Sequence, residues 1–129
     1  MILGKGSPTE PLNNTDVEQI IQQACDELVV EGKRVLVIIP DSTRTSPLPL
    51  MFRLLSQYLG QRVKQLDYLI ALGTHQPMPT EAVSRLLDVS VSDDGEIKDY
   101  PHSRVFNHHW ADPQTLQTIG VIERDEARE

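Results

Sequence analysis

The sequence has almost no cysteine, few aromatic residues and no surplus of positive charge. Cys25 is the one cysteine among 129 residues, so no internal disulfide can form. The net charge of −7 disfavours a basic stripe of the kind that binds nucleic acid. No apolar run approaches the roughly 20 residues of a membrane span, and no signal-peptide core opens the chain. These absences predict a cytoplasmic protein without nucleic-acid or membrane partners.

Three common nucleotide-binding and catalytic motifs are also missing. The chain has no G-x-G-x-x-G and no G-x-x-x-x-G-K-[ST], which are the patterns of dinucleotide and P-loop sites. It has no G-x-S-x-G, the turn that carries the serine of α/β-hydrolases. The 39% of hydrophobic residues is enough for one domain with a buried core.

Helical and strand patterns alternate along the chain. Apolar residues recur at helical spacing over residues 14–31, 48–59 and 80–87. Two aliphatic stretches, residues 35–39 and 66–72, have the length and composition of strands, and the first has the continuous apolar pattern of a strand buried on both faces. The repeated order of helix, strand, polar turn and helix is typical of βαβ units. We therefore predict an α/β fold, a single domain with a mostly parallel sheet and helices on both faces in a Rossmann-like, three-layer arrangement.

Capping residues set the expected ends of these helices. Asn14 or Thr15 is the expected N-cap of the first helix, and Gly32 its C-terminal cap. Gly60 is expected to end the second helix, and Thr80 to cap the third.

The two ends of the chain carry weaker signals. Residues 1–13 indicate an N-terminal arm, residues 14–122 the α/β domain, and residues 123–129 a charged tail that stops without a capping pattern. Within the domain, residues 105–108 predict a short strand and residues 116–122 a last one, with a glycine inside. We expect the chain to be cut before a second domain.

Polar residues follow both predicted strands at the point where each one ends. Asp41 and Arg44 follow the first strand, and His75 follows the second. If the strands are neighbours, these turns share the rim where ligands meet parallel sheets. An arginine can hold a carboxylate or phosphate through a fork of two hydrogen bonds, and a histidine can carry a proton near neutral pH. Asp41 could orient an imidazole or accept from a substrate hydroxyl.

A simpler interpretation of the same residues stays open. Asp41 could be only a helix N-cap or a turn former, and Arg44 could form a local ion pair with it. His75 could be only an exposed turn residue. From the residues alone, the prediction is an α/β domain with a rim that handles anions and protons.

A second group of histidines offers another alternative, a metal-binding module. His102, His108 and His109 lie close in sequence, but their spacing matches no standard zinc pattern. Neighbouring residues of a strand point to opposite faces, so His108 and His109 would not easily share one metal there. A structural role or an exposed surface position is the better prediction, and Trp110 beside them is expected to pack.

Three short motifs resemble the N-terminal domain of the lactate racemase family. They are P-D-S-T-R-T-S-P at residues 40–47, A-L-G-T-H-Q-P-M-P at 71–79 and N-H-H at 107–109. The resemblance covers nearly the whole chain, and it implies half of a two-domain enzyme that depends on a nickel-pincer nucleotide. The substrate would be a small 2-hydroxy carboxylic acid such as lactate, bound in the cleft between the domains.

The resemblance also implies roles for individual residues. His75 would be one of two acid/base histidines, and Arg44 would bind the substrate carboxylate. Asp41 would belong to the same substrate-binding cluster, with Thr43 and Thr74 as nearby hydrogen-bonding groups by position.

The same resemblance limits what this chain could do alone. The family's second catalytic histidine, its cofactor lysine and its nickel-ligating histidine lie further along than residue 129, so no metal ligand is expected here. We expect an inactive N-terminal part of a racemase or epimerase with no cofactor bound. An apolar patch left by the missing domain is expected to drive association, for example as a homodimer. The alternative function is a non-catalytic α/β module that binds an anionic metabolite.

Overall fold

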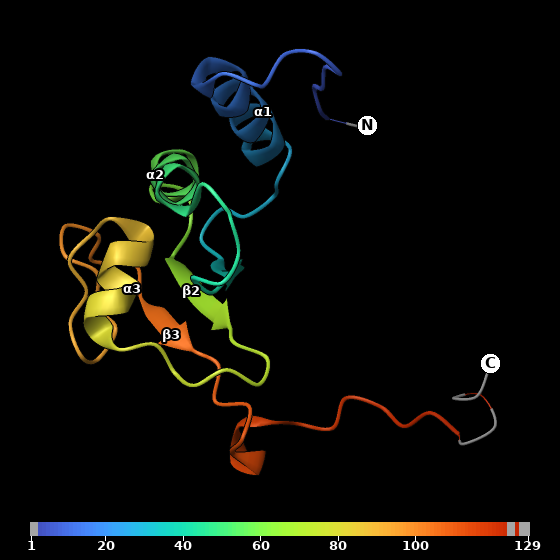
Figure 1. The fold of residues 1–129 in the computed structure, drawn as a ribbon, viewed down its shortest axis with the longest axis vertical. Coiled ribbons are helices and arrows are strands. Elements are labelled where there is room, and N and C mark those ends of the chain that lie inside the picture. The colour runs from blue at the N-terminus through green and yellow to red at the C-terminus, as the bar shows by residue number, and fades with distance from the viewer. Residues whose placement is uncertain (1–2, 124–125, 127–129) are drawn as a thin grey trace.

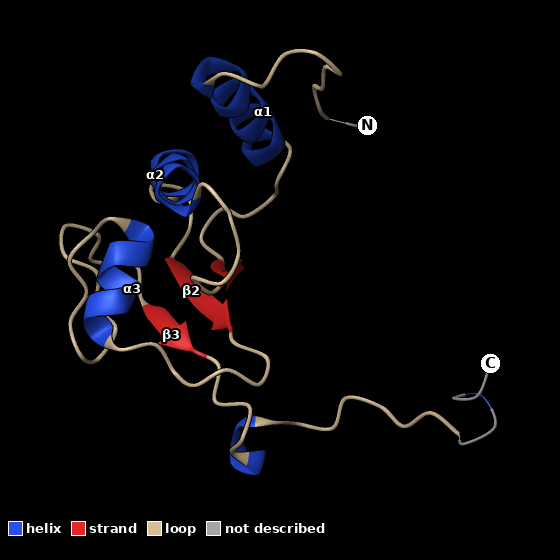
Figure 2. Cartoon of the chain, in the orientation of Figure 1, coloured by secondary structure: helices blue, strands red, loops and turns tan. Residues whose placement is uncertain are grey.

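The computed structural model describes residues 3–123 and 126 as three α-helices, three β-strands and one 3₁₀ turn (Figure 1). The α/β fold, the parallel sheet and the single domain are confirmed. Residues 3–13 have no regular secondary structure and lie beside α1 (Figure 2). The elements in chain order are α1 (Asn14–Asp26), β1 (Arg34–Pro40), α2 (Leu48–Leu59), β2 (Gln65–Ala71), α3 (Thr80–Leu87), β3 (Val105–Asn107) and η1 (Pro113–Thr115).

The sheet has the order β1-β2-β3, and both neighbouring pairs are parallel. The β1–β2 pairing runs over seven residues, from Arg34 opposite Gln65 to Pro40 opposite Ala71. Both strands therefore end at the same level, which brings the turns after them to one rim of the sheet.

The core lies between one face of the sheet and the helices. Every second residue of β2 (Leu66, Tyr68 and Ile70) is buried there. The ring of Phe52 in α2 lies 5.0 Å from that of Tyr68, measured between centroids. Burial raises the pKa of Tyr68 to about 12, although its hydroxyl lies 3.3 Å from that of Ser56.

The opposite face of the sheet carries exposed aliphatic and aromatic residues. Leu36 is 55% exposed, Ile38 66% and Phe106 40%. Ile38 pairs with Leu69, and Leu69 with Phe106, so these three form one apolar row across the sheet. The predicted association of the chain through an apolar patch stays a prediction, and this row is the surface that it would use.

The fold differs from the prediction in the placement of its helices. Within the described residues the helices pack on one face, whereas a helical layer on both faces was expected, with β1 buried on both sides. Successive right-handed crossovers that always step the same way along the sheet place their helices on the same side. The order β1-β2-β3 contains no reversal that would bring α2 and α3 to opposite sides.

The first helix begins and ends earlier than predicted. Its N-cap is Asn13, whose side chain accepts from the backbone N–H of Asp16 at 2.9 Å. It ends at Asp26 rather than at residue 31, because the Arg62 guanidinium binds the carbonyl oxygens of Cys25 and Leu28 at 2.7 and 2.8 Å. These two bonds satisfy carbonyl groups that a longer helix would have bonded internally.

The ends of the other helices agree closely with the sequence. Helix α2 has the predicted bounds, with Gly60 as its C-cap. Helix α3 begins at Thr80, and its N-cap is Pro79. Thr80 does not cap the helix as predicted, because its hydroxyl donates to Asp93 at 2.7 Å instead.

The strand predicted at residues 116–122 is wrong. This segment has no regular structure and extends away from the sheet (Figures 1 and 2), with Ile119 99% exposed. Its apolar residues pair with no neighbouring strand of the described chain, and without such a ladder a short aliphatic run does not form a strand. Most of the predicted charged tail, residues 123–129, lies outside the described residues. No helix in the described part of the chain is long and apolar enough to cross a membrane.

Candidate functional site

Two turns meet at the carboxyl end of the sheet. Asp41 directly follows β1, and the second turn begins after β2 with Leu72 and Gly73. Gly73 has a φ of +59°, which a glycine adopts without strain, and the backbone N–H of His75 donates to the Leu72 carbonyl at 2.9 Å. This tight turn brings His75 back toward the turn after β1.

The His75 imidazole contacts the Asp41 carboxylate. Its Nδ1 lies 2.5 Å from Oδ2 of Asp41, which is only 6% exposed. The other carboxylate oxygen accepts from the backbone N–H and the hydroxyl of Thr43, at 3.0 and 2.5 Å. Since Asp41 engages Nδ1, the Nε2 atom is the one through which His75 could exchange a proton with a ligand.

The same contacts keep Asp41 charged. The hydroxyl of Thr43 and then the imidazole of His75 lower the pKa of Asp41 from its usual 3.8 to about 2, against the opposing effect of burial. A fixed carboxylate beside Nδ1 holds the ring in one tautomer. Of the two roles considered for Asp41, this geometry favours the orientation of an imidazole.

This lowered pKa predicts how stability depends on pH. Because native Asp41 has the lower pKa, the unfolded chain binds more protons between about pH 2 and pH 4, and stability rises with pH there. The contribution is complete above the unfolded value and is lost as the pH falls through about 2. Asp41→Asn should therefore show a flatter dependence of unfolding free energy on pH across this window, measured by urea unfolding at several pH values.

A second variant sharpens this experiment. Thr43→Val removes the hydroxyl that lowers the pKa of Asp41 most, so its pH dependence should fall between those of wild type and Asp41→Asn. Equal steepness in all three proteins would contradict the prediction.

Arg44 lies at the same cavity as the Asp41–His75 pair. The cavity measures about 430 Å³, and Thr74 from the second turn also lines it. None of the ion pairs among the described residues includes Arg44. The alternative of a local Asp41–Arg44 ion pair is therefore wrong, because Asp41 pairs with His75 instead. All five site residues predicted from the sequence (Asp41, Thr43, Arg44, Thr74 and His75) line this one cavity.

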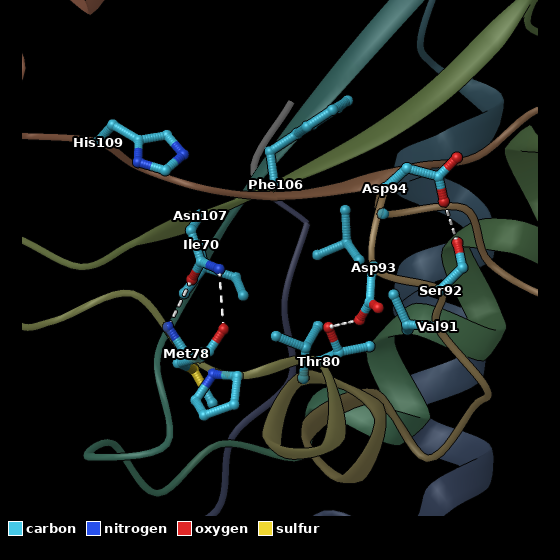
Figure 3. A pocket seen from close by; sticks show the side chains of 14 residues that line it. Ile70, Met78, Thr80, Val91, Ser92, Asp93, Asp94, Phe106, Asn107 and His109 are labelled. Carbon is cyan, nitrogen blue, oxygen red and sulfur yellow. Dashed lines mark hydrogen bonds between the residues drawn. The ribbon is translucent and has the colours of Figure 1, made fainter.

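Two further residues that contact the His75 turn were not predicted from the sequence. Trp110 donates through its indole Nε1 to the backbone carbonyl of His75 at 2.9 Å. The side chain of Asn107 forms two hydrogen bonds with the backbone of Met78, both of 3.0 Å (Figure 3). Asn107 also lines a neighbouring cavity of about 400 Å³. The sequence signal for Asn107 was the N-H-H motif at residues 107–109, and Trp110 directly follows this motif.

The three remaining histidines do not form a metal site. His102 precedes β3, and its carbonyl accepts from Leu66 near the start of β2, whereas His108 and His109 follow β3 at its other end. Across residues 3–123 and 126, no three histidine, cysteine or acidic side chains come together to hold a metal ion. The described residues therefore do not form the metal-binding module considered as an alternative.

Comparisons with known proteins found one family and one similar crystal structure. A family model described as "Lactate racemase N-terminal domain" matches residues 7–127. A crystal structure of a Thermotoga maritima protein is similar with a TM-score of 0.67 and 26% sequence identity. The similarity covers 81% of this chain and 23% of the Thermotoga chain, so this chain spans about a quarter of that protein's length. No curated protein sequence matches.

Proposed function

We propose that this chain, which belongs to the lactate racemase family as an N-terminal domain, supplies half of the active site of a 2-hydroxy-acid racemase or epimerase. The observation that supports this function most is the Asp41–His75 pair, which shares one cavity with Arg44. The pair can carry a proton, and the arginine can bind a carboxylate. A 2-hydroxy acid needs both functions, at neighbouring atoms.

His75 acts as the acid/base group in this proposal. Asp41 holds Nδ1, so Nε2 takes the proton from the substrate hydroxyl and later returns it. Thr43 fixes the carboxylate by two hydrogen bonds, which orients the oxygen that contacts Nδ1 of His75. An imidazole held in this way is rarely in an orientation from which it cannot accept the substrate proton.

Arg44 binds the substrate carboxylate. Its planar guanidinium can donate two parallel hydrogen bonds to a carboxylate, which fixes both the position and the direction of a small acid. Thr74, which lines the same cavity from the turn after β2, is a further hydrogen-bonding group for the same ligand.

The family suggests a nickel-pincer nucleotide in full-length proteins. The described residues form no metal site, so we propose that residues outside them hold this cofactor, together with the second acid/base histidine. On this proposal the chain alone binds the substrate weakly and is not active. A cytoplasmic location is also proposed, because the chain has no pair of cysteines and so does not depend on a disulfide.

The alternative is a non-catalytic module that captures an anionic metabolite. It uses Arg44 in the same way but gives no role to the hydroxyl of the ligand or to His75. The two functions therefore differ in whether the site distinguishes a 2-hydroxy acid from the same acid without its hydroxyl.

Binding of lactate and propionate to the isolated chain tests the two functions. We expect lactate to bind more tightly than propionate, and Arg44→Ala to weaken lactate binding about tenfold or more, because a charge-assisted pair is lost. Titrations monitored by amide NMR shifts of residues 41–44 and 73–75 give both affinities. Arg53→Ala, which removes an exposed arginine of α2, is the matched control and should bind as wild type does.

The His75→Ala variant separates the outcomes. Loss of the preference for lactate over propionate in this variant supports the racemase half-site. Equal affinities for the two acids in wild type, lost with Arg44→Ala and unchanged in His75→Ala, support the binding module instead.

A further inference from the structure

We propose that Trp110 and Asn107 are positioning residues for His75, an inference that rests on the proposed function. The segment at the end of β3 is bonded to the His75 turn at two points and holds the imidazole where Asp41 can orient it. Neither residue touches the cavity of Asp41 and Arg44, so both would act through the backbone of the turn.

The turn has few contacts of its own. Residues 73–77 are all exposed, and the side chain of His75 is 53% exposed. Segments with few buried contacts open locally at low free energy. The Asp41 carboxylate holds only the end of the His75 side chain, so the backbone that carries this side chain needs separate anchors.

Trp110 provides the first anchor. Its indole N–H donates to the carbonyl of His75 itself, at 2.9 Å, across 35 positions of sequence. Trp110 is 37% exposed, so its ring contributes less to the core than a buried aromatic residue does. An indole is only a donor, and it usually finds a partner for that donor. Here the partner is the backbone of the residue proposed to carry the proton.

Asn107 provides the second anchor. It attaches to the turn at Met78, three residues after His75. Its amide Nδ2 donates to the Met78 carbonyl, and its Oδ1 accepts from the Met78 N–H (Figure 3). A side-chain amide that satisfies both backbone groups of one residue imitates a strand neighbour. Asn107 is the last residue of β3, and the backbone N–H of His108 donates to Ile70 at 3.1 Å, so this anchor is continuous with the sheet.

The tautomer of the His75 ring tests this inference directly. In wild type, Asp41 should keep the proton on Nδ1, whereas an imidazole without such a partner prefers it on Nε2. Trp110→Phe keeps a ring but removes the donor, and Asn107→Ala removes the second anchor. In both variants we expect His75 to shift toward the Nε2–H form, measured from ¹⁵N imidazole shifts at alkaline pH.

Tyr58→Phe is the matched control, because it also removes one ring donor, here the hydroxyl that donates to Glu18 at 2.9 Å. It should leave the His75 tautomer unchanged. A wild-type tautomer in both Trp110→Phe and Asn107→Ala would overturn the inference, provided that their amide spectra show folded proteins.

Kinetics separate this inference from the proposed function. In the cofactor-loaded enzyme that carries this domain, Trp110→Phe should lower kcat about tenfold and change KM less than about twofold, since a misplaced base affects the reaction more than binding. A rise in KM with kcat unchanged would count against a positioning role. If the wild-type enzyme racemises no 2-hydroxy acid, the proposed function fails, and the tautomer result still decides whether Trp110 and Asn107 position His75.

Discussion

Asparagine in place of His75 should lower kcat for racemisation about a hundredfold to ten-thousandfold, in the cofactor-loaded enzyme that carries this domain. The asparagine amide can still donate to Asp41, as Nδ1 of the imidazole does, so the fold of the turn should persist. The variant loses the basic nitrogen that takes and returns the hydroxyl proton. KM should change little, because Arg44 still binds the carboxylate. Rates measured with each lactate enantiomer give both parameters.

His102→Asn is the control for this experiment. His102 lies near the opposite end of the sheet, beside the start of β2, and its carbonyl rather than its ring bonds to Leu66. The control enzyme should keep the wild-type kcat. If the His75→Asn enzyme kept more than about a tenth of the wild-type kcat, His75 would not be the acid/base group.

Truncation of Phe52 to alanine should have the largest effect on stability. The side chain is 2% exposed, and its ring packs against Tyr68 and, at 4.9 Å between centroids, against Tyr100. Loss of this contact and the cavity left behind should cost about 3–5 kcal/mol of unfolding free energy. That is a large part of the roughly 5–15 kcal/mol that stabilises a typical domain. Urea unfolding followed by circular dichroism measures the change.

The other phenylalanine of the chain is the matched control. Phe106 is 40% exposed on the open face of the sheet, so Phe106→Ala should cost less than about 1.5 kcal/mol. Similar losses of unfolding free energy in the two variants would show that the main core does not lie between the sheet and the helices.

The sequence predicted the helices and strands more accurately than it predicted which of their faces are buried. The aliphatic run of residues 35–39 correctly indicated a strand, and the two polar turns meet at one cavity, as their positions predicted. A continuous apolar run has no period, however, so it cannot show whether a strand is covered on one side or on both. Leu36 and Ile38 are exposed because no described helix lies over them.

Other details depend on contacts between segments far apart in sequence. Asp41 has two cationic or titratable neighbours, Arg44 three residues away and His75 34 residues away. The sequence left open which of the two Asp41 contacts, and the β1–β2 register brings the histidine to the carboxylate. The early end of α1 likewise depends on Arg62, which no local pattern connects with Cys25. Trp110 could not be assigned for the same reason, since its donor meets a carbonyl in another loop.

The alignment of β1 with β2 also determines where the chain can tolerate insertions and deletions. One residue added within either strand would shift the remainder of that strand by about 3.3 Å and turn every later side chain to the opposite face. Pro40 would no longer lie opposite Ala71, and the carboxylate of Asp41 would leave the imidazole of His75. Residues added in the exposed segment 116–122, which pairs with no strand of the described chain, leave that alignment intact. Changes of length in that segment are therefore compatible with the site, whereas a single added residue within β1 or β2 would separate its two halves.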